Sequence, residues 1–202
     1  MKSLDADEIL REKLADSLAV RTYFELLECV GVGRVNTREF RRKFNRFCMV
    51  RRDEAWQSIY YGLFQELTAR RRSVTLRDIL PELDRRIKAQ LKQDRLETSF
   101  SSKMLAFLRP ADFPIWDSWV IKNMLEQNGV DLRLNVKGNV KAREEEALRR
   151  FDELTGWFRN ALRTKAVQKA VRRFNDYLPE GVGEKVSAMK KFDWLMWAKR
   201  PG

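Results

Sequence analysis

The sequence contains no histidine and only two cysteines, Cys29 and Cys48. Without histidine, proton transfer would fall to carboxylates, lysines or tyrosines. Two cysteines can form neither a disulfide framework nor a four-ligand zinc site. Phosphate-binding loops, dinucleotide-binding fingerprints and nucleophile elbows are also missing. We therefore expect a protein that needs no metal and no other cofactor.

Long apolar runs are missing as well. No stretch approaches the roughly 20 apolar residues that a membrane-spanning helix needs, and the N-terminus lacks a signal-peptide pattern. We therefore expect a cytoplasmic protein with no membrane partner.

Positive charge, in contrast, is abundant. The chain has 41 Lys and Arg against 29 Asp and Glu, which gives a net charge of +12. Such a field favours a polyanionic partner, most commonly nucleic acid. A membrane surface is the rival partner, but the charge is spread along the chain instead of being gathered on one helix. A third possibility is an acidic protein partner.

The pattern of apolar residues is helical along nearly the whole chain. Apolar side chains recur three and four positions apart, and polar caps or glycines separate the segments. The expected helices cover approximately residues 3–14, 18–30, 37–47, 53–69, 75–93, 99–109, 117–129, 140–162, 166–178 and 185–199. We predict an all-α protein of about eight to ten helices. Residues 1–202 would form a single domain, in which two lobes are possible with the stretch 98–124 between them.

Residues 98–124 form the most informative stretch. A helix that carries Lys103 ends before Pro110, and a second proline, Pro114, keeps the connection from being helical throughout. Asp117 stands where the next helix needs an N-cap. One lysine and one carboxylate are thus placed near the starts of two adjacent helices, among apolar residues.

This stretch resembles the helix-hairpin-helix DNA glycosylases, in particular the prokaryotic 8-oxoguanine-glycosylase-like proteins. The matching segments are SSKMLAFLRP at 101–110 and FPIWDSWV at 113–120, and FDWLMW at 192–197 is similar to the closing helix of the prokaryotic group. The resemblance implies that Lys103 matches the family's lysine and Asp117 its catalytic aspartate. Two features depart from the family pattern. The lysine and the aspartate are only 14 positions apart, and residues 99–102 replace the glycine-rich hairpin.

The chemistry that the resemblance implies suits these residue types. A desolvated carboxylate, here Asp117, can stabilise the positive charge that develops on the sugar or can activate water. Lys103 could attack the sugar carbon and form a Schiff base, or could only contact DNA. Trp116 and Trp119 flank the aspartate and are candidates for the wall that stacks on a flipped base. Each has a simpler alternative, namely a helix cap, a solvated lysine and core tryptophans.

The predicted DNA contacts lie in two places. Ser101, Ser102 and Arg109 belong to the matching segment. The run Arg70, Arg71 and Arg72, like the basic runs at 41–43 and 51–52, could bind phosphates or could form solvated faces. The turn at 31–34 could hold a phosphate at a helix start, although a helix end followed by a turn is the simpler interpretation.

The sequence predicts a DNA glycosylase that acts on a flipped, damaged or modified base in double-stranded DNA. A non-catalytic DNA-binding protein with the same fold and a basic protein-interaction module remain alternatives. The identity of the base, the oligomeric state and the biological role, in repair or in antiviral defence, stay open.

Overall fold

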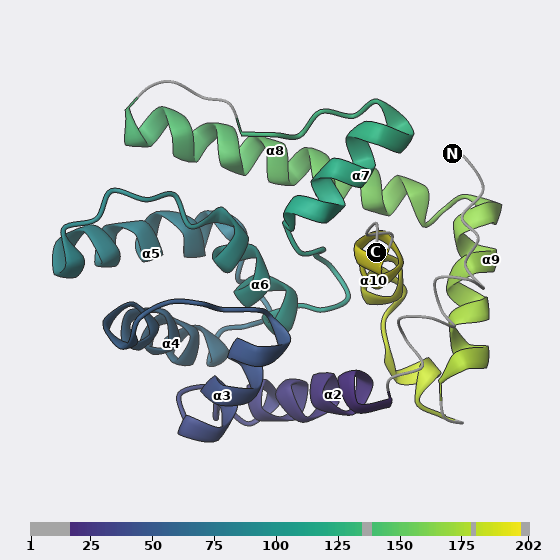
Figure 1. Ribbon diagram of the computed structural model, residues 1–202, viewed down its shortest axis with the longest axis horizontal. Coiled ribbons are helices and arrows are strands. Elements are labelled where there is room, and N and C mark those ends of the chain that lie inside the picture. Colours follow the sequence, from purple (N-terminus) through teal and green to yellow (C-terminus); the bar gives the residue numbers. More distant parts are fainter. Residues whose placement is uncertain (1–16, 135–138, 179–180, 199–202) are drawn as a thin grey trace. The chain divides into compact units, whose positions relative to one another are not determined.

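The computed structural model describes residues 17–134, 139–178 and 181–198, and within these residues all regular structure is helical (Figure 1). The all-α prediction is confirmed, whereas the helix expected at 3–14 lies outside the described residues. The nine α-helices and two short 3₁₀ helices of the described residues are α2 (Ser17–Gly31), α3 (Arg38–Phe47), α4 (Glu54–Thr68), α5 (Leu76–Leu91), α6 (Thr98–Leu108), α7 (Ser118–Asn128), α8 (Val140–Ala161), α9 (Lys165–Arg173), η1 (Phe174–Tyr177), η2 (Gly183–Lys185) and α10 (Ala188–Ala198).

Several helices begin at the polar residues that the sequence marks as caps. The side chain of Thr37 accepts a hydrogen bond from the backbone N–H of Phe40 at 3.2 Å, and Asp53 accepts one from Trp56 at 2.8 Å. Each cap satisfies an N–H group that has no partner inside its own helix. Gly129 ends α7 in the left-handed conformation, with φ of 66°. These three capping positions follow from local sequence alone.

The last helix begins later than expected. A start near Lys185 was wrong, because residues Gly183–Lys185 form the 3₁₀ turn η2 and α10 begins at Ala188. Ser187 explains the difference: its hydroxyl accepts a hydrogen bond from the N–H of Lys190 at 3.1 Å and thus caps α10.

The chain divides into two compact units, which we describe separately. Among the described residues, unit 2 consists of residues 18–109 and 139–148, and unit 1 contains the others. The chain passes from unit 2 to unit 1 between Arg109 and Pro110, which is inside the stretch 98–124.

Aromatic side chains fill the core of unit 2. The ring of Phe44 on α3 lies 5.1 Å from that of Phe107 on α6, and Tyr23 on α2 lies 5.5 Å from the same ring. Phe40 packs edge-on against Phe64 of α4 at 5.8 Å. All five are buried, and burying a side chain of this size stabilises the fold by ~1.5–3 kcal/mol. Helices α4, α5 and α6 pack on one another beside this cluster (Figure 1).

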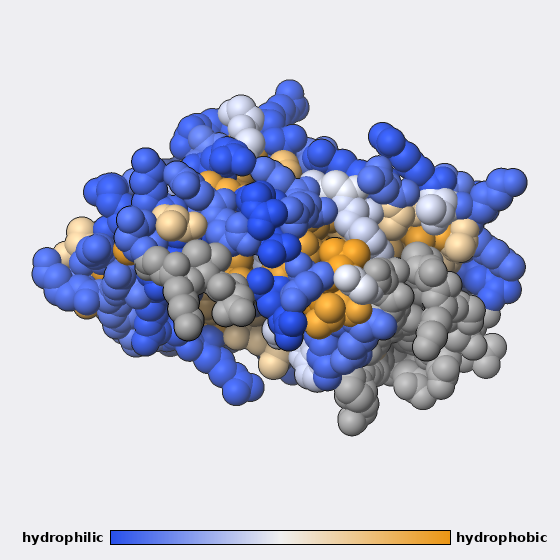
Figure 2. Space-filling view, turned by 90° about the horizontal axis from the view of Figure 1, so that it is seen from above, coloured by the Kyte–Doolittle hydropathy of each residue, from blue (hydrophilic) through white to orange (hydrophobic). Residues whose placement is uncertain are grey.

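Unit 1 has its own aromatic core around α10. Phe192 of α10 lies 5.0 Å from Phe158 of α8, and Trp194 stacks on Phe174 at 5.6 Å. Helices α7 and α9 both pack against α10. Within the described residues every helix is too short or too polar to cross a lipid bilayer. Hydrophilic side chains cover most of the face drawn in Figure 2.

Candidate functional site

Asp117 stands at the N-terminus of α7, as the sequence predicts. Its backbone is extended, with φ of −117° and ψ of 144°, and its Oδ1 accepts a hydrogen bond from the N–H of Trp119 at 2.9 Å. The residue is half-buried, and its Oδ2 makes no hydrogen bond or ion pair with any described residue. One oxygen therefore fixes the carboxylate to the helix, while the other remains able to act on a ligand.

The two tryptophans beside Asp117 differ in exposure. Trp116 is only 8% exposed, whereas Trp119 is half-buried and has the ammonium of Lys122 5.2 Å from its ring centroid. Of the two, Trp119 presents more of its surface for stacking on a base. Trp116 belongs mainly to the core of unit 1.

The connection that leads to Asp117 is held by α10, which sequence reasoning missed. The backbone N–H of Ile115 donates to Oδ1 of Asp193 at 3.1 Å, and the hydroxyl of Ser187 donates to the carbonyl of Pro110 at 2.6 Å. Lys190 forms an ion pair with Oδ2 of Asp193 at 2.6 Å, and both side chains are only 4% exposed. A proline-rich connection lacks helical hydrogen bonds of its own, so these contacts fix the backbone just before Asp117.

A second contact ties α7 itself to α10. The side-chain amide of Asn123 donates to the carbonyl of Met196 at 2.7 Å, and Asn123 is buried. The only signal for these partners in the sequence was the polar character of Asp193 and Asn123 within apolar segments. A buried polar group needs a partner, but the sequence does not say which.

Lys103 lies on α6 and thus in unit 2, whereas Asp117, Trp116 and Trp119 lie in unit 1. Lys103 is half-buried, and its Nζ lies 5.0 Å from the ring centroid of Phe100. This is a cation–π contact, which holds the ammonium by the negative face of the ring.

The predicted DNA contacts on α6 are enclosed in the protein. Ser101 and Ser102 are both 0% exposed. The hydroxyl of Ser102 donates to the carbonyl of Ser99 at 2.8 Å, whereas that of Ser101 is buried and has no hydrogen-bond partner in the described part of the chain. Arg109 is half-buried and donates to the carbonyl of Val74 at 3.0 Å. A phosphate could reach the two serines only after a rearrangement of α6.

The three arginines of the run 70–72 differ in their contacts. Arg71 donates to the carbonyl of Gly31 at 2.7 Å and so satisfies the end of α2, next to the turn at 31–34. Arg70 forms a long, exposed ion pair with Asp78 at 3.7 Å. Arg72 is exposed and has no hydrogen bond or ion pair to a described residue.

A group of buried polar side chains surrounds the start of α6. Glu97, only 4% exposed, accepts hydrogen bonds from the guanidinium of Arg52 at 3.1 Å and from the indole of Trp56 at 3.2 Å. Its own backbone N–H donates to Oδ1 of Asp84 at 3.1 Å. Burial raises the pKa of Asp84 to about 7. Sequence reasoning assigned no role to these residues.

No group of three or more Cys, Asp or Glu side chains in the described residues is arranged to hold a metal ion. Comparison with protein-family models, with curated proteins and with solved structures finds no match for this chain.

Proposed function

We propose that this protein is a DNA glycosylase that removes a damaged or modified base, with Asp117 as its essential carboxylate. The observation that carries the proposal concerns the two carboxylate oxygens of Asp117. Oδ1 accepts a hydrogen bond from the first turn of α7, and Oδ2 makes no hydrogen bond or ion pair with a described residue. The net charge of +12 and the similarity of residues 101–120 to glycosylase segments support DNA as the substrate.

The reaction breaks the bond between C1′ of the sugar and the base nitrogen, and the electron pair leaves with the base. Positive charge then develops on the sugar, where a fixed carboxylate stabilises it. Water adds to C1′, and Oδ2 of Asp117 is the acceptor for its proton. The contacts from Asp193 and Ser187 keep the aspartate in place during this step.

Lys103 has two candidate roles. As a nucleophile its amine would add to C1′ in place of water, and the resulting Schiff base would lead to strand cleavage. As a DNA contact it would only neutralise a phosphate. Its position over the ring of Phe100 leaves both roles open, since in either one the ammonium would move to meet the substrate.

The test uses duplex oligonucleotides that carry candidate lesions or modified bases, with alkali-labile abasic sites as the measurement. Asp117→Asn is expected to reduce base release at least ~100-fold, because the charge opposite the sugar is lost. Asp53→Asn is the matched control: Asp53 is also an N-cap that bonds the first turn of its helix, and asparagine caps equally well. Equal activity of the two variants would overturn the assignment of Asp117.

Borohydride trapping separates the roles of Lys103. If the lysine is the nucleophile, reduction of the imine links the wild-type protein covalently to DNA, and Lys103→Ala forms no adduct and cleaves no strand. If the lysine is a DNA contact, Lys103→Ala still releases the base but with a raised KM.

A non-catalytic DNA-binding protein is the second candidate. The enclosed hydroxyls of Ser101 and Ser102 favour it, since in the free protein they cannot grip a phosphate. Tight DNA binding without base release from any of the substrates would support this alternative.

A further inference from the structure

Helix α3 has two faces of opposite character. Phe40 and Phe44 are at most 1% exposed and form part of the core of unit 2. Arg38, Arg42 and Arg46 lie four positions apart along the helix and are all exposed. A spacing of four residues places neighbouring side chains on one side, about 6 Å apart along the helix axis. We call Arg38, Arg42 and Arg46 the arginine row.

The arginine row has no hydrogen-bond or ion-pair partner among the residues that the structure describes. Glu39 is the one carboxylate on α3, and Lys43 holds it at 2.7 Å. Lys43 also bridges to Glu25 of α2 at 3.0 Å. The guanidinium groups of the row therefore form no hydrogen bond or ion pair with a described residue. Lys43 on the same helix, in contrast, is paired with two carboxylates.

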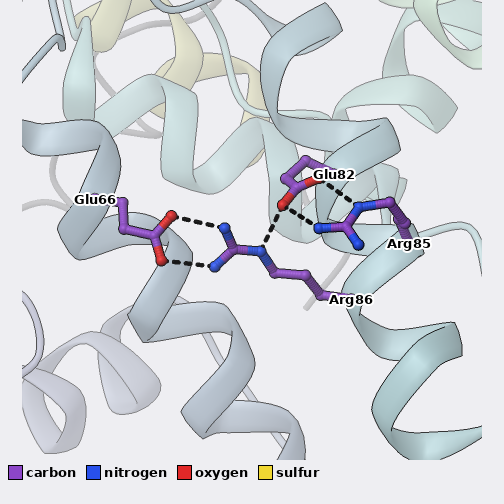
Figure 3. A network of polar contacts seen from close by, with 4 residues as sticks. All are labelled: Glu66, Glu82, Arg85 and Arg86. Atoms are coloured by element: carbon purple, nitrogen blue, oxygen red, sulfur yellow. Dashed lines mark hydrogen bonds and ion pairs between the residues drawn. The ribbon is translucent and has the colours of Figure 1, made fainter.

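Helices α5 and α7, in contrast, pair several of their surface charges. On α5, Glu82 bonds both Arg85 and Arg86, and Arg86 reaches Glu66 of α4 at 2.6 Å (Figure 3). On α7, Lys122 pairs with Glu126. Like charges four positions apart destabilise a helix, and within the described residues no hydrogen bond or ion pair offsets this cost for the arginine row. A polyanionic ligand would offset it.

Exposed apolar side chains flank α3 on both sides in the sequence. Val32, in the turn before the helix, is 64% exposed, and Met49, just after it, is 54% exposed. They are two of the four large hydrophobic residues that stand exposed in the described part of the chain. Met49 also has a φ of 53°, which non-glycine residues rarely adopt. Single exposed apolar residues are ordinary on protein surfaces, so these two show only that both ends of α3 are open to solvent.

We infer that the arginine row binds the phosphate backbone of duplex DNA. Guanidinium groups pair with phosphate oxygens bidentately, and three in a line can contact successive phosphates of one strand. A membrane surface fits less well, because the apolar face of α3 is buried against the core and cannot enter lipid. The inference rests on the proposed function only in taking DNA as the polyanion, and it does not require that Asp117 be catalytic.

Helix α9 provides a matched comparison. Lys165, Lys169 and Arg172 are also exposed and positive, and α9 carries no acidic residue. Two of these three are lysines. A lysine ammonium is a point charge, whereas a planar guanidinium can donate two parallel hydrogen bonds to one phosphate. The chain thus offers two basic helices of equal charge but different chemistry.

The experiment measures binding of a lesion-free duplex by fluorescence anisotropy at several salt concentrations. R38Q/R42Q/R46Q and K165Q/K169Q/R172Q each remove three positive charges, and circular dichroism checks that both remain folded. The α3 variant is expected to lose affinity at least about tenfold and to reduce the slope of log K against log salt by roughly 2–3. The α9 variant is expected to change affinity less than about threefold.

Equal losses from the two variants would overturn the inference, because net charge alone would then explain binding. R38K/R42K/R46K keeps the charges and should keep the salt slope while binding more weakly; loss of the slope in this variant would also contradict the inference. Phosphatidylserine vesicles that bind the protein more tightly than DNA, through α3, would point to a membrane instead. Since the duplex carries no lesion, the outcome is independent of whether the protein releases bases.

Discussion

At the scale of single residues, Asp84 is the least expected feature. It lies on α5 and is 5% exposed, and its Oδ2 has no hydrogen-bond partner among the described residues. Burial is the main reason why its pKa rises to about 7; the hydrogen bond from the backbone N–H of Glu97 opposes the rise, the carboxylates of Glu144 and Glu97 add to it, and Arg143 also opposes it. In the sequence Asp84 stands beside Arg85 and Arg86 and is indistinguishable from a surface residue. Its burial depends on tertiary packing: α5 packs against α6, and the backbone N–H of Glu97 donates to its Oδ1.

This pKa predicts a pH-dependent stability. Between about pH 4 and pH 7 the carboxyl of Asp84 is ionised in the unfolded chain but protonated in the folded one. The folded state then binds more protons, so the free energy of unfolding falls as pH rises through this range and levels off above it. Asp84→Asn removes the effect and should stabilise the protein relative to wild type by about 2 kcal/mol more at pH 8 than at pH 5.

Urea unfolding at the two pH values measures the difference. Asp176→Asn, at an exposed carboxylate in unit 1, is the control and should show the same small effect at both. A stability change at Asp84 that does not depend on pH would contradict the assigned pKa.

At the scale of helices, the sequence predicted the features that depend on neighbouring residues, such as the N-caps. Thr37, Asp53 and Asp117 cap their helices because a short polar side chain at that position satisfies the N–H groups that follow. Contacts between distant segments were not predictable. Asp193 bonds a backbone N–H 78 positions earlier, and periodicity shows that a residue is buried but not what it meets. The same limit explains why the burial of Ser101 was missed.

The ion pair between Lys190 and Asp193 gives a prediction for α10. Asp193→Asn keeps an acceptor for the N–H of Ile115 but leaves the buried ammonium without its carboxylate, and should lower the free energy of unfolding by about 3 kcal/mol. Lys190→Met with Asp193→Asn removes both charges and should recover at least about 1 kcal/mol of that loss.

Chemical denaturation of Asp193→Asn, of Lys190→Met and of the double variant tests whether the two residues are coupled. If the effects of the single substitutions simply add, the pair does not act as a unit. In that case the ion pair would not contribute to holding Asp193 on the backbone of Ile115.

At the scale of the whole molecule, net charge is the property that the sequence determines most directly. It is a sum over residues and does not depend on the fold, so the expectation of a polyanionic partner follows from composition alone. The location of the binding surface does depend on the fold. Arg71, which the sequence offered as a DNA contact, satisfies the carbonyl of Gly31. The guanidinium groups of Arg38, Arg42 and Arg46 bond to no other residue that the structure describes.

The salt dependence of wild-type binding separates DNA from an acidic protein as the partner. If six or more phosphates are contacted, the affinity for a duplex should fall by at least about 1,000-fold between 50 and 200 mM salt, because counterions are released from the DNA. Polyglutamate at equal charge concentration carries carboxylates without the regular array of phosphates, so it should compete poorly. Weak or salt-independent DNA binding, together with tight binding of polyglutamate, would favour the protein-interaction alternative and exclude both DNA functions.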